Sequence, residues 1–121
     1  MMVMRFYQRK WRKQEAVLTE LLRPFDSWIE TASPQENVQA KACLLRVLDQ
    51  VRNIRPDRRS YAAGNSHFDY LFQLSIVAQE LRRKEYVHAC HEMVDLIHFN
   101  PVSQPRIRTN LICLLSDYLE G

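Results

Sequence analysis

Glycine is almost absent from this chain: among 121 residues, only Gly64 and Gly121 are glycine. Glycine provides the backbone conformations and the close approach to ligands that nucleotide-binding loops and tightly turned sheets require. Walker-type and GxGxxG loops are therefore excluded, and a sheet joined by tight turns is disfavoured. The five prolines then become the main signals that end one element of structure and begin the next.

Apolar residues recur at spacings of three and four along most of the chain, which is the period of amphipathic helices. Pro24 interrupts the first such segment, where it removes a backbone N–H and predicts a kink or a break. The apolar face of that segment consists of Met4, Tyr7, Trp11, Leu18, Leu21, Leu22, Phe25, Trp28 and Ile29. The core face predicted for the next helix consists of Val38, Cys43, Leu44, Val47, Leu48, Val51 and Ile54.

The start of this second helix carries a strong local signal. Ser33 precedes Pro34, and Glu36 follows at the position of a capping box. Pro56 ends the helix, and residues 56–65 form the one long loop. Ser66 is the expected N-cap of the helix that follows the loop.

Two antiparallel helices are predicted over residues 67–99. A first apolar stripe contains Tyr70, Leu74, Val77 and Leu81, and a second begins out of phase with it at Tyr86, Cys90, Met93 and Ile97. This change of phase predicts a turn near Arg82–Glu85. Pro101 ends the second helix, and Ser103 is expected to cap a final helix whose apolar face is Ile107, Leu111, Leu114, Leu115 and Tyr118.

These patterns predict an all-α fold, a single-domain bundle of five or six helices with short loops over residues 1–121. Residues 70–101 also resemble one tetratricopeptide unit, at the positions of Ile76, Ala89, Met93 and Pro101. Val77 and Lys84 depart from that family at its small residue and its turn glycine, and no second copy is present. The resemblance implies a solenoid-like helical hairpin and no particular function.

Basic residues are concentrated in three clusters, although the net charge is only +3. The first lies in residues 1–13, the second contains Arg52, Arg55, Arg58 and Arg59, and the third contains Arg82, Arg83 and Lys84. Arginine outnumbers lysine by 13 to 4, and its planar fork suits carboxylates and phosphates. An acidic protein, a nucleic-acid backbone, or a solvated face without any ligand fits this pattern.

Glu85, His88 and His91 are weak candidates for metal ligands, because an E-x-x-H spacing brings its two side chains together on a helix. Di-iron bundles that use this spacing need a second such motif and further glutamates, which the sequence lacks. The pattern favours an ordinary solvated face, on which His88 pairs with Glu92 and His91 with Asp95. No metal or cofactor is therefore expected.

Nucleophilic catalysis is not expected either. Cys43, Cys90 and Cys113 all occupy core-facing positions of helical segments, which is typical of buried thiols in a reducing compartment. No serine lies on a glycine-flanked elbow. The sequence thus predicts that the chain is not an enzyme.

The favoured hypothesis is a small soluble helical interaction or regulatory protein that binds a partner protein or forms a homodimer. A surplus of apolar residues together with arginine clusters is typical of such surfaces. The expected contact residues are Arg55, Arg58, Arg59 and Tyr61 in the long loop, followed by Trp11 and Arg12. The alternative is a nucleic-acid-associated regulator that uses the same arginines on phosphates.

No apolar run approaches the roughly 18–20 residues of a membrane span. The N-terminus also lacks the apolar core of a secretory signal. The sequence therefore predicts a cytoplasmic protein with no membrane partner.

Overall fold

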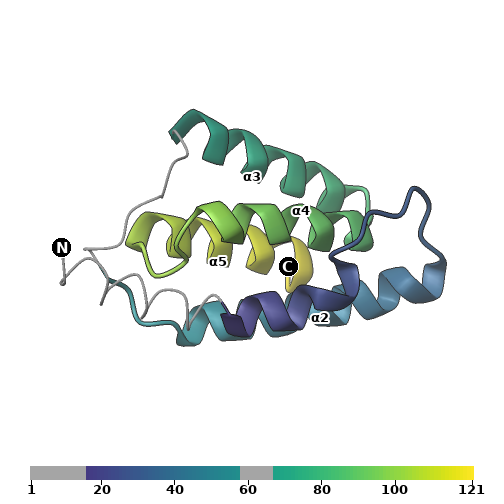
Figure 1. Ribbon diagram of the computed structural model, residues 1–121, viewed down its shortest axis with the longest axis horizontal. Coiled ribbons are helices and arrows are strands. Elements are labelled where there is room, and N and C mark those ends of the chain that lie inside the picture. Colours follow the sequence, from purple (N-terminus) through teal and green to yellow (C-terminus); the bar gives the residue numbers. More distant parts are fainter. Residues whose placement is uncertain (1–15, 58–66) are drawn as a thin grey trace.

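The computed structural model describes residues 16–57 and 67–121, and the secondary structure of these residues is helical (Figure 1). Residues 16–22 are helical and continue into a short 3-10 helix, η1 (Arg23–Phe25). The longer helices are α2 (Pro34–Asn53), α3 (His67–Arg82), α4 (Tyr86–Phe99) and α5 (Pro105–Leu119). The predicted all-α bundle is confirmed.

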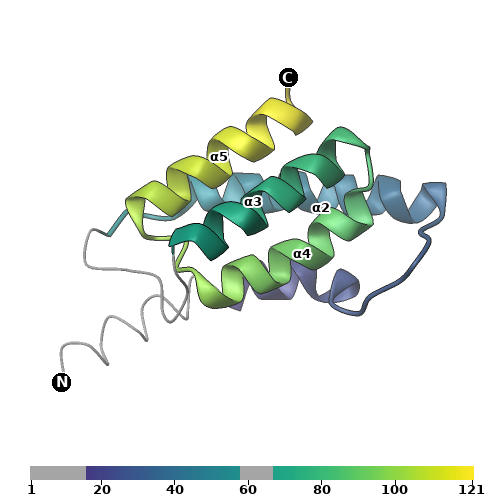
Figure 2. The same ribbon diagram turned by 90° about the horizontal axis from the view of Figure 1, so that it is seen from above.

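The four long helices pack in a ring in which α2 contacts α4 and α5, and α3 contacts the same two helices. Figure 1 accordingly shows α2 and α3 on opposite sides, with α4 and α5 between them, and Figure 2 shows the same bundle from above. Fully buried leucines come from residues 16–22 as well as from the long helices, and η1 packs against α4. The described part of the chain therefore encloses one hydrophobic core.

Short-range signals place several helix ends where the sequence predicts them. Ser33 Oγ accepts a hydrogen bond from the Glu36 N–H at 3.1 Å, and Glu36 Oε1 accepts one from the Ser33 N–H at 2.9 Å. The backbone hydrogen bond from Ser33 lowers the pKa of Glu36.

The α-helical residues end at Leu22 and the chain tightens into η1, which contains Pro24, so the predicted interruption is confirmed. No second helix follows in the described residues 26–33 before α2: Trp28 and Ile29 are not helical and are 59% and 38% exposed, so their assignment to the apolar helical face is wrong.

The predicted turn between α3 and α4 is confirmed, and it forms without glycine. Lys84 adopts a left-handed conformation, with φ of 60°. Its N–H donates to the Leu81 carbonyl at 3.1 Å, and the Glu85 N–H donates to the Glu80 carbonyl at 2.9 Å. This pair of hydrogen bonds is the Schellman arrangement that ends many helices. The helical hairpin implied by the tetratricopeptide resemblance is therefore present.

The N-terminus of α4 is capped by a side chain from another helix. Asn37 Oδ1 on α2 accepts a hydrogen bond from the Val87 N–H at 3.1 Å, whereas the N-cap residue Glu85 makes no side-chain cap hydrogen bond. Free N–H groups in the first turn of a helix need such acceptors. This contact joins α2 to the beginning of α4, and no local sequence motif predicts it.

Other sequence predictions about individual positions are also wrong. The N-cap of α5 is Gln104 and not Ser103, because Pro105 takes the first helical position and Gln104 Oε1 accepts the Ile107 N–H at 2.8 Å. Val38 is not in the core, since its side chain is 70% exposed. Cys113 is exposed, whereas Cys43 and Cys90 are buried as predicted.

The errors at Val38 and Cys113 have the same geometric cause. Each residue is two positions from a buried one, Ala40 or Leu111, and two positions turn a helix by about 200°. The side chains therefore point to the opposite side of the helix from the core. The predicted N-cap of α3, Ser66, lies outside the described residues.

No helix among residues 16–57 and 67–121 combines the length and the apolar character needed to cross a bilayer.

Candidate functional site

The structure describes only one of the residues predicted to contact a partner. Arg55 is exposed and follows the end of α2. Arg58, Arg59, Tyr61, Trp11 and Arg12 lie outside the described residues. The predicted contact region in the long loop therefore stays a prediction.

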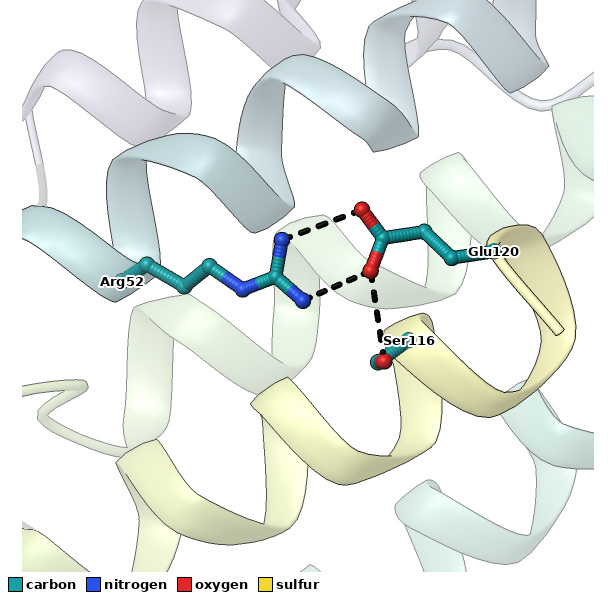
Figure 3. A network of polar contacts seen from close by, with 3 residues as sticks. All are labelled: Arg52, Ser116 and Glu120. Atoms are coloured by element: carbon teal, nitrogen blue, oxygen red, sulfur yellow. Dashed lines mark hydrogen bonds and ion pairs between the residues drawn. The ribbon is translucent and has the colours of Figure 1, made fainter.

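Arg52, which belongs to the same basic cluster, makes an ion pair within the chain (Figure 3). Its guanidinium donates to Glu120 Oε2 at 3.0 Å and to Glu120 Oε1 at 2.6 Å, and Ser116 Oγ donates to the same carboxylate at 3.3 Å. Arg108 donates to the carbonyls of Ile54 and Arg52 at 2.8 and 2.9 Å. These two arginines therefore join the end of α2 to α5.

Replacing Arg52 by glutamine is expected to raise the pKa of Glu120. The hydrogen bond from Arg52 is the main cause that lowers this pKa below its ordinary value of 4.5. The folded state therefore binds this proton less tightly than the unfolded chain does. The stabilising contribution is present above pH 4.5 and is lost as the pH falls through the lowered pKa.

A pH titration of the Glu120 carboxyl carbon by NMR measures this change directly. The matched control is Arg23→Gln, which breaks an exposed pair with Glu20 elsewhere on the surface and should leave Glu120 unchanged. A melting-temperature difference between the Arg52 variant and the parent should also shrink as the pH falls below 4.5. An unchanged pKa of Glu120 would contradict the role assigned to Arg52.

A shallow groove of about 530 Å³ runs along the outer face of α2 to the beginning of α4. We call it the α2 groove. Its lining consists of Asn37, Val38, Lys41, Ala42, Leu45, Lys84 and Tyr86. Val38, Ala42 and Leu45 follow one another at spacings of four and three, so they form one column on the helix. Val38 and Leu45 are 70% and 37% exposed, so this apolar column faces solvent.

The charged residues of the α2 groove are both cations. Lys41 Nζ lies 5.6 Å from the centroid of the Tyr86 ring, and Lys84 extends from the turn between α3 and α4. No carboxylate is among the lining residues. The groove therefore combines an exposed apolar column with positive charge.

The spacing of the buried residues of α2 would have indicated this exposed surface, but the predicted core face includes Val38 and omits Ala40. The buried residues of α2 begin at Ala40 and follow the order Ala40, Cys43, Leu44, Val47, Leu48 and Val51. Once Ala40 is taken as part of the core face, Val38 falls on the opposite side of the helix. The contribution of Lys84 and Tyr86 could not have been predicted, because it depends on how α4 packs against α2.

A second cluster of chemically active side chains lies at the junction of α3 and α4. Glu80, Glu85 and His88 each bring one possible ligand atom within 4.8 Å of the others. His88 Nδ1 is 3.6 Å from Glu85 Oε2, and His88 Nε2 is 2.9 Å from the Ile29 carbonyl oxygen. This Glu85–His88 pair is the E-x-x-H spacing that the sequence singles out.

His88 and His91 of α4 do not lie on an ordinary solvated face, which corrects the sequence interpretation. The Trp28 ring stacks on His88 at 4.6 Å between centroids and meets His91 edge-on at 5.4 Å. His91 Nδ1 lies 3.3 Å from the Phe25 carbonyl oxygen. Both histidines therefore hold the segment from η1 to Ile29 against α4, and His91 is not one of the three residues of the Glu80–Glu85–His88 cluster.

Glu80 is the most perturbed carboxyl group of the cluster. Burial is the main cause that raises its pKa to about 7, and the charge of Glu92 adds to the effect. Its Oε1 atom is buried and has no hydrogen-bond partner among the described residues. Sequence reasoning missed Glu80, because it lies on α3 and joins the E-x-x-H pair only through the turn.

The two buried thiols differ: the hydrogen bond between them lowers the pKa of Cys43, whereas Cys90 is not activated as a nucleophile. A hydrogen bond with Cys43, together with burial, raises the pKa of the Cys90 thiol. Its Sγ also lies 3.5 Å from the Ala40 carbonyl oxygen, so it is packed between α2 and α4. A thiol with a raised pKa stays protonated at neutral pH and is a poor nucleophile.

Comparison of the chain with protein-family models, with curated proteins and with solved structures finds no match.

Proposed function

We propose that this protein acts by binding another protein, and that its α2 groove receives an acidic amphipathic helix of the partner. The observation that carries the proposal is the exposed apolar column of α2 between two lysines. No catalytic step is part of the proposed function.

The apolar column provides the surface that would be removed from water. Val38 is 70% exposed and Leu45 is 37% exposed, so a partner that covers them would remove from water the apolar surface that folding leaves accessible. A helix laid along a groove presents anchoring side chains at spacings of three and four, which match the spacing of Val38, Ala42 and Leu45.

The charge of the groove selects the kind of helix. Lys41 and Lys84 favour acidic side chains beside the apolar anchors of the partner, and they disfavour a basic helix. Arg55 and the predicted contact residues Arg58 and Arg59 are also cationic and would suit the same partner. Lys41 already lies near the Tyr86 ring, so its position is partly set before a partner binds.

Two synthetic helices of about 18 residues test this proposal. Both carry leucines at the same spacing of three and four, and their polar positions are glutamate in one and lysine in the other. The acidic peptide is expected to bind at least about tenfold more tightly in fluorescence anisotropy. The changes that it causes in the backbone NMR shifts of the protein should centre on Val38, Leu45 and Tyr86.

A substitution in the α2 groove distinguishes specific binding of the acidic peptide from nonspecific binding. Val38→Asp is expected to weaken binding of the acidic peptide by at least about tenfold, because it places a carboxylate in the apolar column. The matched control is Val17→Asp, which changes another exposed valine outside the groove. Both substituted side chains face solvent, so circular dichroism should show an unchanged helix content.

Three results would contradict the proposal. The first is equal binding of the two peptides, or no binding of either at about 1 mM. The second is a homodimer in sedimentation that Val38→Asp disrupts, because a second copy of the chain would then cover the groove. The third is tighter binding of a DNA or RNA oligonucleotide, with affinity falling steeply between about 50 and 200 mM salt, which would favour the nucleic-acid alternative.

A further inference from the structure

We propose that Glu80, Glu85 and His88 bind a divalent transition-metal ion, which joins the last turn of α3 to the first turn of α4. This inference is independent of the proposed function. It departs from the sequence-based expectation of no metal, because the tertiary structure adds a ligand that the helical spacing alone does not contain.

The turn between α3 and α4 assembles the three side chains. The hydrogen bond from the Glu85 N–H to the Glu80 carbonyl closes the turn at 2.9 Å, so both residues lie at the same end of the helical hairpin. Their ligand atoms and a ring nitrogen of His88 lie within 4.8 Å of one another. Metal bonds of about 2.0–2.2 Å require these atoms to approach further. The side chain of Glu85 is 44% exposed, and its Oε2 atom already lies 3.6 Å from His88 Nδ1.

The ring of His88 is held in the orientation that a ligand needs. A carbonyl oxygen only accepts hydrogen bonds, so the contact of Nε2 with the Ile29 carbonyl at 2.9 Å places a proton on Nε2. In the neutral ring, Nδ1 then carries the lone pair, and this atom faces Glu85. Metal-binding histidines are commonly fixed in this way by a backbone carbonyl, and stacking on Trp28 restrains the ring further.

Glu80 supplies a carboxylate oxygen that the protein itself leaves without a partner. Its Oε1 atom is buried and makes no hydrogen bond among the described residues. Buried polar atoms are almost always paired, so the unpaired oxygen of a carboxylate that lies beside two further ligand groups is suited to a bound cation. Glu92 lies near enough to affect Glu80 electrostatically and adds negative charge to the surroundings of the site.

The ligand types favour a transition metal over magnesium or calcium. One imidazole nitrogen and two carboxylates suit Zn²⁺ and related ions, whereas Mg²⁺ and Ca²⁺ prefer sites composed entirely of oxygen atoms. Three protein ligands leave at least one coordination position open. The ion would restrain the α3–α4 hairpin at its turn.

Isothermal titration of the tag-free, chelator-treated chain with zinc chloride tests the proposal. One equivalent of Zn²⁺ is expected to bind with a dissociation constant of about 10 μM or lower. Manganese should bind more weakly and magnesium should not bind. Glu80→Gln, which preserves the shape of the side chain, is expected to reduce the affinity for Zn²⁺ by at least about tenfold.

Two control variants and one spectroscopic measurement exclude other zinc sites. His98→Gln changes an exposed histidine of α4 outside the cluster, and Cys113→Ser removes the exposed thiol; both should bind Zn²⁺ like the parent. In the parent protein, the ¹⁵N resonance of His88 Nδ1, and not that of Nε2, should shift on addition of Zn²⁺. Absence of binding at about 1 mM Zn²⁺, full binding by Glu80→Gln, or loss of binding in Cys113→Ser would overturn the proposal.

Discussion

Replacing Leu22 by alanine is expected to lower the free energy of unfolding by about 3 kcal/mol. Leu22 is fully buried, although it comes from a short helical segment near one end of the described chain. Its truncation removes apolar surface from the core and leaves a cavity that the surrounding helices can fill only in part. The neighbouring Leu21 carbonyl also lies 3.0 Å from Cys43 Sγ on α2, so the segment has a fixed place against the bundle.

Urea denaturation followed by circular dichroism measures this effect. The matched control is Val17→Ala, which shortens a side chain that is 47% exposed on the same helical segment and should change the stability by less than about 0.5 kcal/mol. If both substitutions had the same small effect, residues 16–22 would not be an integral part of the core.

Replacing Ala40 by leucine is expected to destabilise the fold by about 1–3 kcal/mol or more. Ala40 is fully buried on α2, and Cys90 Sγ of α4 lies 3.5 Å from its carbonyl oxygen. Cys90 also forms a hydrogen bond with the buried Cys43 of α2, so small residues line this contact between the two helices. A leucine side chain has no space there without moving α4 away from α2.

Ala42→Leu is the matched control for this prediction. Ala42 lies on the exposed side of the same helix, and leucine has nearly the same helix propensity as alanine. The control variant should therefore melt close to the parent, whereas Ala40→Leu should melt at a clearly lower temperature. Equal melting temperatures for the two variants would show that α2 and α4 are not closely packed at Ala40.

Structure that depends on neighbours in sequence could be predicted well. The capping box of Ser33 and Glu36 uses residues three positions apart, and the break at Pro24 follows from the missing N–H of that residue. The turn after Arg82 follows from the change of phase between two apolar stripes. Each of these features requires only local backbone geometry, which the residue types themselves determine.

Features that depend on the direction of a side chain were predicted less well. Apolar residues at helical spacing predict Val38 and Cys113 in the core, yet both face away from it. The hydrophobic pattern of a helix tolerates such residues on its outer side, since a folded surface contains many apolar atoms. The apolar column of the α2 groove therefore depends on which side of α2 packs against the rest of the bundle.

The sequence by itself determined the helical composition of this protein, the main helix boundaries and the antiparallel hairpin. It could not determine that Glu80 joins Glu85 and His88, that Asn37 caps α4, or that Lys84 and Tyr86 complete a groove on α2. The physical reason is the range of the interactions: helix formation depends on residues three or four positions apart, whereas these sites depend on how the helices pack against one another and on the turn that joins two of them.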